Sequence, residues 1–248
     1  MDQRDPTFPP LMTGRVAVDP PDPFACAKDA AARGEASAGE VFWLPDGDRV
    51  RLAVVLEPDV PAERAVQMQF AMMVAAGDAL GAAGPPEMAV HYRWPSVIAV
   101  NGAVAGEVRL ALPDDAGAGD VPRWLVVALD LALARPDGAP EPGEESGRTT
   151  LRDEGLGDIG PSALIESLCR HFLVWIHLWT DDGFRPVHDA WMARLEGGGG
   201  DTEAVGHGVS GRAMGLEEDG SLLLRTAEGM RACAFMDHVE RVAGEGAS

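Results

Sequence analysis

The chain has 248 residues and a mass of 26.1 kDa, and its 40 acidic residues against 20 basic ones give a formal net charge of −20 at pH 7. An acidic surface of this kind repels nucleic-acid phosphates and anionic membranes, which argues against both as partners. The hydrophobic share of 46% and the charged share of 24% are typical of a folded globular protein with one large domain or two smaller ones.

The cysteine pattern and the length of the apolar segments predict the cellular compartment. Cys26, Cys169 and Cys233 form no C-x-x-C pair, so neither a disulfide framework nor a cysteine-based zinc site is predicted. The polar, proline-rich N-terminus does not read as a signal peptide, and no stretch approaches the ~18 to 20 apolar residues of a membrane span. The sequence therefore predicts a cytoplasmic protein. Lys28 is the only lysine, so any chemistry that requires lysine must use it.

The first third of the chain predicts an arm, a helix, a strand and a second helix. Residues 1–23 contain six prolines and predict an extended N-terminal arm. A helix is predicted over 24–33, and the alternation of VRLAVVLE over 50–57 predicts a half-buried strand. Apolar residues between Val66 and Leu80 then recur at spacings of three and four, which predicts an amphipathic helix with its methionines in the core.

The middle third, residues 88–133, is rich in strand patterns. Asn101-Gly102 separates two apolar runs, and this pair predicts a hairpin with a type I′ turn. The segment WLVVALDLAL over 124–133 is apolar almost throughout, which predicts a central strand covered on both faces. The fold class predicted is α+β, with a mixed β-sheet and helices.

The last third predicts two helices and a separate small domain. Residues 135–160, rich in Pro, Gly and acids, predict a solvated, mobile connection. A long helix is predicted from Pro161 and a shorter one through Val187 and Trp191, ending at the glycines 197–200. The short β segments beyond them predict a small SH3-like β-barrel. The predicted domains are thus 1–23, 24–196 and 201–241.

Several motif-like patterns lack the context that their chemistry needs. GHGVSG over 206–211 matches G-x-G-x-x-G, but no helix follows it, so a β turn is predicted. His171 and His177 lie six residues apart on one predicted helix, whereas zinc ligands on one helix face need three or four. No metal site and no phosphate-binding loop is predicted.

The stretch RWPSVIAVNGAVAGEVRLAL, residues 93–112, carries the most information. Trp-Pro, a strand, a turn, Ala-Gly and another strand follow in that order, and the apolar strand at 124–133 comes next. This order resembles the biotin/lipoate A/B protein ligase family, whose biotin ligases carry Trp-Pro-Asn-Asp, a turn with a lysine, Ala-Gly and a strand of the type VVIGIGINL. The likeness covers roughly 24–240 and is strongest to a divergent biotin-ligase-like branch with a C-terminal domain of unknown function.

The resemblance implies a class II ligase-like catalytic fold and an ATP-dependent activity. The family activates biotin, lipoate or another acyl acid as an adenylate and transfers it to a lysine of a carrier protein. It thus implies biotin or another carboxylic acid, ATP with magnesium, and an acyl-carrier protein as ligands and partners.

This sequence departs from the family where the chemistry is expected. Ser96 and Val97 stand in place of Asn and Asp, and the family's lysine position is Ala103, so no catalytic residue is assigned. Where the family has an adenylate loop rich in Gly and Arg, only Arg33 and Gly34 match. The candidate ligand-pocket residues are those of the retained frame and the nearby cations: Arg33, Gly34, Trp43, Arg93, Trp94, Pro95, Gly102, Ala105, Gly106 and Arg109.

Three functions follow from these residues. The first is a catalytically degenerate biotin-ligase-like protein that keeps a small-acid or nucleotide pocket. The second is an active ATP-dependent biotin or acyl-carrier-protein ligase that uses Arg93 and Arg109. The third is an adaptor or regulator that binds a protein through its acidic surface and barrel, with no small ligand. The Trp-Pro and Ala-Gly pairs also have a purely structural interpretation, as packing residues of a hairpin.

Overall fold

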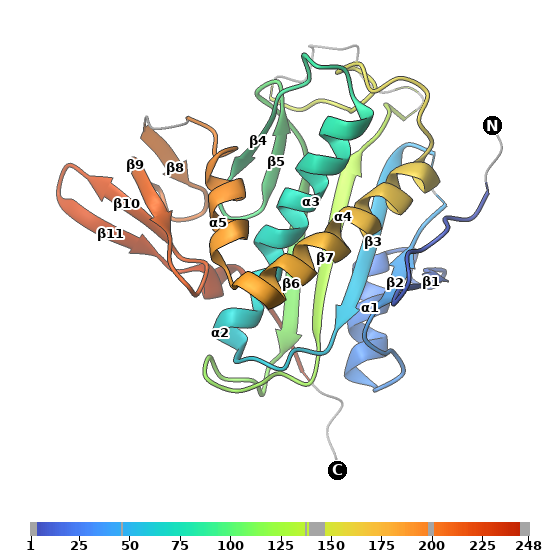
Figure 1. Ribbon diagram of the computed structural model, residues 1–248, viewed down its shortest axis with the longest axis horizontal. Helices are drawn as coiled ribbons and strands as arrows, with labels where there is room; N and C mark the ends of the chain where they lie inside the picture. Colours follow the sequence, from blue (N-terminus) through green and yellow to red (C-terminus); the bar gives the residue numbers. More distant parts are fainter. Residues whose placement is uncertain (1–3, 46, 137, 139–146, 198–200, 244–248) are drawn as a thin grey trace.

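The computed structural model describes residues 4–45, 47–136, 138, 147–197 and 201–243. Its centre is a mixed sheet with strand order β1-β2-β3-β7-β6-β5-β4, and β12 pairs with β6 beyond the end of β5 (Figure 1). The strands are β1 (Thr13–Val16), β2 (Glu40–Trp43), β3 (Arg49–Leu56), β4 (Val90–Arg93), β5 (Val97–Val100), β6 (Ala103–Pro113), β7 (Leu125–Ala132) and β12 (Glu240–Val242).

The strands with clear sequence signals form as predicted. β7 lies between β3 and β6 and is antiparallel to both, so its apolar run is buried in the middle of the sheet. Asn101 and Gly102 connect β5 to β6 with positive φ angles of 49° and 86°, as a type I′ turn requires. These two features confirm the predicted hairpin and the predicted central strand.

Helices cover both faces of the sheet. α3 (Met68–Ala83), α4 (Pro161–Asp182) and α5 (Arg185–Met192) lie over one face, with the short α2 (Ala62–Ala65) leading into α3 (Figure 1). α1 (Pro23–Ala32) lies on the other face, against β2, β3 and β7. Within the described part of the chain, no helix combines the length and the apolar content needed to cross a membrane.

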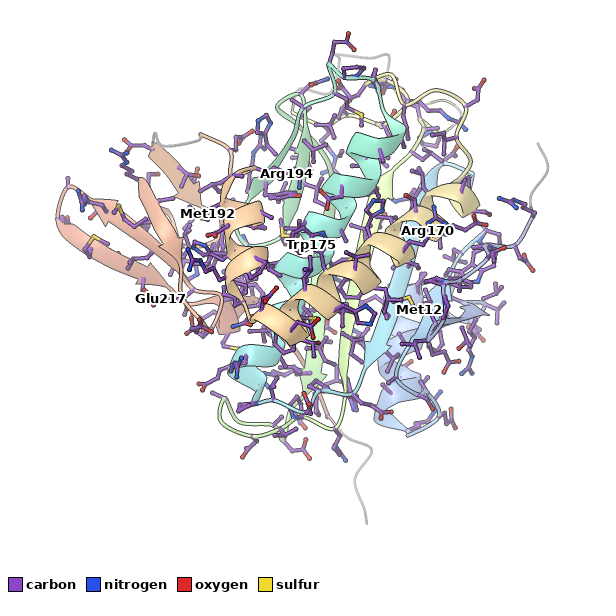
Figure 2. The ribbon with its side chains drawn as sticks, viewed as in Figure 1. Met12, Arg170, Trp175, Met192, Arg194 and Glu217 are labelled. Carbon is purple, nitrogen blue, oxygen red and sulfur yellow. The ribbon has the colours of Figure 1, made fainter. Side chains whose placement is uncertain are left out.

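α3 is not amphipathic, contrary to the prediction. Its residues from Met68 to Gly77 are buried on every side, because the sheet covers one side of the helix and α4 the other. Its methionines are core residues, as predicted. Near its end, Asp78 accepts hydrogen bonds from Trp175 Nε1 of α4 and from Arg194 Nη2, both at 2.8 Å, and Figure 2 labels the two donors. The polar residues of this helix therefore join it to its neighbours.

The C-terminal segment forms an open sheet where a small barrel was predicted. β8 (Asp201–Ala204), β9 (Val209–Leu216), β10 (Leu222–Thr226) and β11 (Gly229–Cys233) are antiparallel in the order β11-β10-β9-β8. Among the residues that the structure places, no pairing joins β8 to β11 to close a barrel. The chain instead returns to the main sheet through a short 3-10 helix (Phe235–His238) and β12, because Phe235 and Val239 are buried in the main core.

Two predicted connecting segments are more ordered than expected. Part of the predicted N-terminal arm forms β1, which pairs in parallel with β2. In the predicted mobile connection over 135–160, Leu151 and Leu156 are buried in the core. The remainder of that connection at 137 and 139–146, and the glycines 198–200, lie outside the described residues. The turn predicted for GHGVSG is confirmed, and it joins β8 to β9.

Candidate functional site

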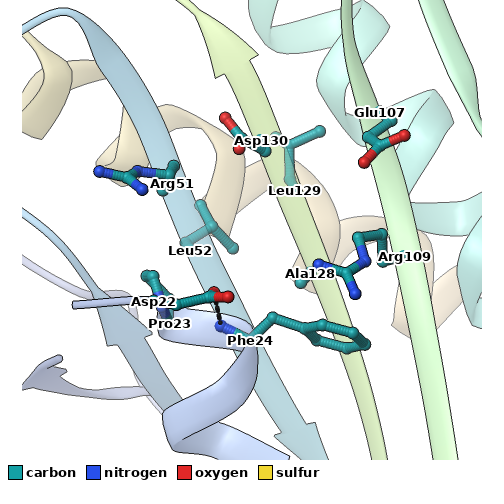
Figure 3. Close-up of a pocket in the computed structure, with 10 residues that line it drawn as sticks. All are labelled: Asp22, Pro23, Phe24, Arg51, Leu52, Glu107, Arg109, Ala128, Leu129 and Asp130. Atoms are coloured by element: carbon teal, nitrogen blue, oxygen red, sulfur yellow. Dashed lines mark hydrogen bonds between the residues drawn. The ribbon is translucent and has the colours of Figure 1, made fainter. Parts of the chain in front are cut away.

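A cavity of about 120 Å³ opens on the α1 face of the main sheet (Figure 3). Its walls come from three neighbouring strands and the start of α1. The side chain of Asp22 caps this helix by accepting a hydrogen bond from Phe24 N at 2.9 Å. The lining residues are Asp22, Pro23, Phe24, Arg51, Leu52, Glu107, Arg109, Ala128, Leu129 and Asp130.

The register of the sheet produces a charged row across this cavity. Arg51 of β3 lies opposite Asp130 of β7, and Asp130 lies opposite Glu107 of β6. Figure 3 shows these three side chains projecting from adjacent strands. Two carboxylates directly opposite one another are unfavourable in a sheet. Arg49 offsets part of this cost, since its Nε lies 2.7 Å from Asp130 Oδ1.

Arg109 occupies the next position on the same face of β6. Side chains two residues apart in a strand point to the same side, so Glu107 and Arg109 both face the cavity. The Arg109 guanidinium lies over the Phe24 ring, 4.3 Å from its centroid, and Nη2 donates to Glu240 Oε2 at 3.2 Å. The cavity is therefore lined by five ionic and five apolar residues.

A second cavity, of about 130 Å³, lies at the sheet edge between β12 and the N-terminal end of β5. Gln69 of α3 lines it and is 2% exposed. The Gln69 amide nitrogen donates to Val108 O at 2.8 Å, whereas its Oε1 has no hydrogen-bond partner among the described residues. A buried acceptor without a donor costs free energy, so this cavity favours a water molecule or a ligand group that donates. Arg109 lines this cavity too, so it connects the two.

His238, which lines the second cavity, belongs to a histidine pair. His207 Nε2 and His238 Nε2 are 3.0 Å apart, and both rings pack against Trp94. Burial and the neighbouring His207 lower the pKa of His238. In the described part of the chain, no three His, Cys, Asp or Glu side chains gather closely enough to hold a metal ion.

The structure separates the candidate pocket residues that the sequence grouped together. Only Arg109 lines the first cavity, and only Pro95 and Arg109 line the second. Arg33 and Gly34 follow the last turn of α1, about 15 Å along the helix from the end that borders the cavity. Arg33 Nε pairs there with Glu35 at 3.0 Å.

The remaining candidates are packing and turn residues. Trp43, Trp94 and Ala105 are buried in the main core, and Trp94 Nε1 donates to Gly220 O of the C-terminal sheet at 3.0 Å. A Cβ atom on Gly106 would lie 2.1 Å from the backbone oxygen of Asp130, so only glycine allows β6 and β7 to approach there.

Arg93 is held at the hairpin end of the sheet. Its Nη2 donates to Gly102 O at 2.8 Å, and its guanidinium pairs with Glu196. The hydrogen bond with Glu196 is the main cause that raises the pKa of Arg93 and lowers that of Glu196. Ala103, the first residue of β6, follows the Asn101-Gly102 turn and has an uncharged side chain.

Sequence reasoning missed most of the ionic groups around the first cavity. Arg51 and Asp130 were not candidates, because each lies in a strand pattern interpreted as structural. Glu240 was not a candidate either, because no motif or strand pattern was recognised around it. A charged residue within an otherwise apolar central strand, as at Asp130, was the available signal.

The comparisons with known proteins agree on one family. The family model described as "Biotin/lipoate A/B protein ligase family" matches residues 8–193. A curated biotin–[acetyl-CoA-carboxylase] ligase from Paracoccus denitrificans is 29% identical over 203 residues, covering 79% of this chain and 81% of the relative.

Solved structures give the same result. A biotin protein ligase-like protein of unknown function from Silicibacter sp. TM1040 is 36% identical, with a TM-score of 0.84 over 95% of this chain and 99% of that one. Biotin protein ligase from Aquifex aeolicus in complex with biotin and ATP has a TM-score of 0.66 at 16% identity, over 90% of this chain and 94% of that one. The second likeness shows the fold alone.

Proposed function

Because the chain belongs to the biotin/lipoate A/B protein ligase family, we propose that it is a biotin protein ligase-like protein that has lost acyl adenylation and keeps a pocket for a small acid or nucleotide fragment. The observation that carries the proposal is the first cavity, which is small and lined by ionic groups. The cavity lies on the α1 face and is lined by Glu107, the residue that follows the retained Ala-Gly pair.

The size of the cavity argues against a bound acyl-adenylate. Pockets that enclose drug-sized ligands have volumes of about 300 to 1,000 Å³, whereas this cavity has about 120 Å³. An acid and a nucleotide do not fit in it together. A single small acid does, with its charged end at Arg109.

The chemistry of the site also argues against adenylation. The position where the resembling ligases have a lysine is Ala103, and Val97 has no polar group for a nucleotide or magnesium. An oriented cation beside the reacting groups contributes several kcal/mol to such a transition state. Ala103 supplies no cation itself, and Arg93 of the same stretch is paired with Glu196.

Thermal unfolding with candidate ligands tests the proposal. Biotin, lipoate, octanoate and ATP are added singly, and then each acid is added with ATP. A ligand at about 100 times its Kd stabilises by about 2.7 kcal/mol, which raises the Tm of a chain of this size by about 5 to 10 °C. We expect an acid alone to raise the Tm and ATP to add nothing. Acid-dependent ATP–pyrophosphate exchange above background would overturn the proposal.

An active ATP-dependent biotin or acyl-carrier-protein ligase is the second candidate, and the position of Arg109 on the cavity wall favours it. In that case Arg109→Ala should abolish ATP–pyrophosphate exchange, and Arg93→Ala should not, since Arg93 lies outside the cavity. Equal loss in both variants would show that the cavity is not the reacting site.

A protein-binding adaptor is the third candidate, with the open C-terminal sheet of β8 to β11 as its binding surface. Met214 and Met230, which are 42% and 50% exposed on the C-terminal sheet, favour it. Replacement of both by Asp should then release a co-purifying acyl-carrier or other protein while the Tm stays unchanged. Retention of that protein would count against this candidate.

A further inference from the structure

The only lysine of the chain and Arg109 meet at one carboxylate, that of Glu240. Lys28 lies on α1, Arg109 on β6 and Glu240 on β12, so three distant segments supply the cluster. Glu240 Oε1 pairs with Lys28 Nζ, and Oε2 accepts from Arg109 Nη2 at 3.2 Å. Phe24 lies beneath both cations, with Lys28 Nζ at 4.5 Å and Arg109 Cζ at 4.3 Å from the ring centroid.

An anion between these two cations is required by their surroundings. The Lys28 side chain is only 14% exposed, so its ammonium group has little water around it. A partly desolvated charge without a partner is costly, and two cations on one aromatic ring repel each other. The carboxylate of Glu240 satisfies both, and another anion of similar size would satisfy them equally.

The cluster lies where a ligand can reach it. Arg109 lines both cavities, and Glu240 lines the second one. The side chain of Glu240 is 39% exposed, so its carboxylate can turn toward solvent without disturbing the core.

The backbone of β12 does not depend on the Glu240 carboxylate. Residues 240–242 pair in parallel with 111–113 of β6. Arg241 Nη1 also donates to Ala116 O at 2.8 Å and to Pro113 O at 3.3 Å. Displacement of the carboxylate therefore requires a change of rotamer and leaves the strand pairing in place.

We propose that Lys28 and Arg109 form a binding site for the anionic group of a small ligand, a carboxylate or a phosphate, and that Glu240 occupies this site as a built-in competitor. The inference deepens the proposed function and rests on it, because Arg109 also lines the proposed pocket. A ligand anion binds by displacing Glu240, so the affinity of the free chain is lower than that of a chain without this carboxylate.

The single lysine provides a direct measurement. Labelling with ¹³Cε-lysine gives one side-chain NMR signal, because Lys28 is the only lysine. Inorganic phosphate and acetate are titrated separately into the natural chain and into Glu240→Gln. We expect the Lys28 signal of Glu240→Gln to respond to one of the two anions with at least a ten-fold lower Kd. The anion with the larger gain identifies the ligand group as phosphate or carboxylate.

Glu40→Gln is the matched control. Glu40 pairs with Arg15 at 3.4 Å, and Arg15 lies 5.0 Å from the centroid of the Phe42 ring, so this variant also frees an arginine on a phenylalanine. It should leave the Lys28 titration as in the natural chain. Adding Arg109→Met to Glu240→Gln should remove the gain in affinity.

Two results would overturn the inference. One is equal anion affinity in Glu240→Gln and the natural chain, and the other is an unchanged gain after Arg109→Met. If Glu240→Gln does not fold, Lys28→Met in the natural chain replaces it: a phosphate- or acetate-induced rise in Tm that survives Lys28→Met also overturns the inference. An acid-induced Tm rise in the natural chain can persist in each case, so failure here is distinguishable from failure of the proposed pocket.

Discussion

The two faces of the main sheet serve different purposes. The face under α3, α4 and α5 carries a continuous apolar core that includes Trp94 and Ala105 of the family-like stretch. The face under α1 carries a smaller apolar cluster, and its open end has the charged row of Arg51, Asp130 and Glu107. Trp94 and Ala105 therefore contribute to packing, while the face on which we propose a ligand pocket has a charge pattern of its own.

The largest expected effect is on the core face, from Trp94→Ala. Trp94 is fully buried, and its indole nitrogen ties the main sheet to Gly220 of the C-terminal sheet. Truncating a buried Trp costs about 3 to 5 kcal/mol of the free energy of unfolding, which urea denaturation measures. Trp94→Phe gives an intermediate case, because it keeps one aromatic ring while it loses the hydrogen bond and part of the buried ring volume. A cost below 1 kcal/mol for Trp94→Ala would break the comparison, since the retained Trp would then need a role other than packing.

A smaller loss is expected where the two faces share the sheet, at Gly106. In Gly106→Ala the new methyl group would meet Asp130 O at 2.1 Å, so β6 and β7 must separate. Overpacking of this kind costs about 1 to 3 kcal/mol. Gly81→Ala in α3 is the control, since nothing lies within 4 Å of its Cβ position. There a stabilisation of up to about 1 kcal/mol is expected from helix propensity. Equal effects in the two variants would argue that the β6–β7 approach is not tight.

The dependence of stability on alkaline pH tests how deeply Cys169 is buried in the core under α3, α4 and α5. Burial raises the pKa of the Cys169 thiol to about 12 from an ordinary value of 9.0. The unfolded thiol loses its proton near pH 9 and the folded one does not, so this contribution to stability is complete below pH 9 and falls as pH rises toward 12. Well above pH 9, where the unfolded thiol is fully ionised, the free energy of unfolding falls by about 1.4 kcal/mol per pH unit. Between pH 8 and 10, the natural chain should therefore lose about 1.4 kcal/mol more than Cys169→Ala.

If the free energy of unfolding fell by the same amount in the natural chain and in Cys169→Ala between pH 8 and 10, the Cys169 thiol would be accessible to solvent in the folded protein. Tyr92, whose pKa burial also raises, titrates in both proteins and cancels in the comparison.

The smallest effect on stability is expected from Arg93→Ala. The Arg93–Glu196 pair is about one third exposed, and exposed ion pairs contribute about 0 to 1 kcal/mol. Arg93→Ala should also leave any acid-induced rise in Tm unchanged, whereas Arg109→Ala should remove it. If Arg93→Ala removed the acid-induced rise in Tm and Arg109→Ala did not, the ligand site would lie near the β5–β6 hairpin and not on the α1 face.

Local signals predicted the parts of the fold that local geometry determines. Asn101-Gly102 predicts a turn because both residues adopt positive φ readily, and the apolar run of β7 predicts a central strand because neither of its faces meets water. The burial of Met68 to Gly77 on every side of α3 was not predictable, since the outer side of this helix is covered by α4, which lies about ninety residues further along the chain.

The ligand side depends on contacts that no local pattern contains. Glu240 meets Arg109 across 131 positions and Lys28 across 212. The sequence identified Arg109 as a candidate and Lys28 as unique, but only the fold places them on one carboxylate. β12 itself has three residues, which is too short for a recognisable strand pattern.

The parallel pairing of β12 with β6 has a consequence for synthesis. Residues 111–113 emerge from the ribosome long before residues 240–242, and until then this stretch of the β6 edge has exposed hydrogen-bonding groups. An unpaired strand edge is a template for association with other chains. Chains whose translation stops before β12 should therefore aggregate or be held by chaperones, and folding of the main sheet should be completed only after translation has passed residue 242.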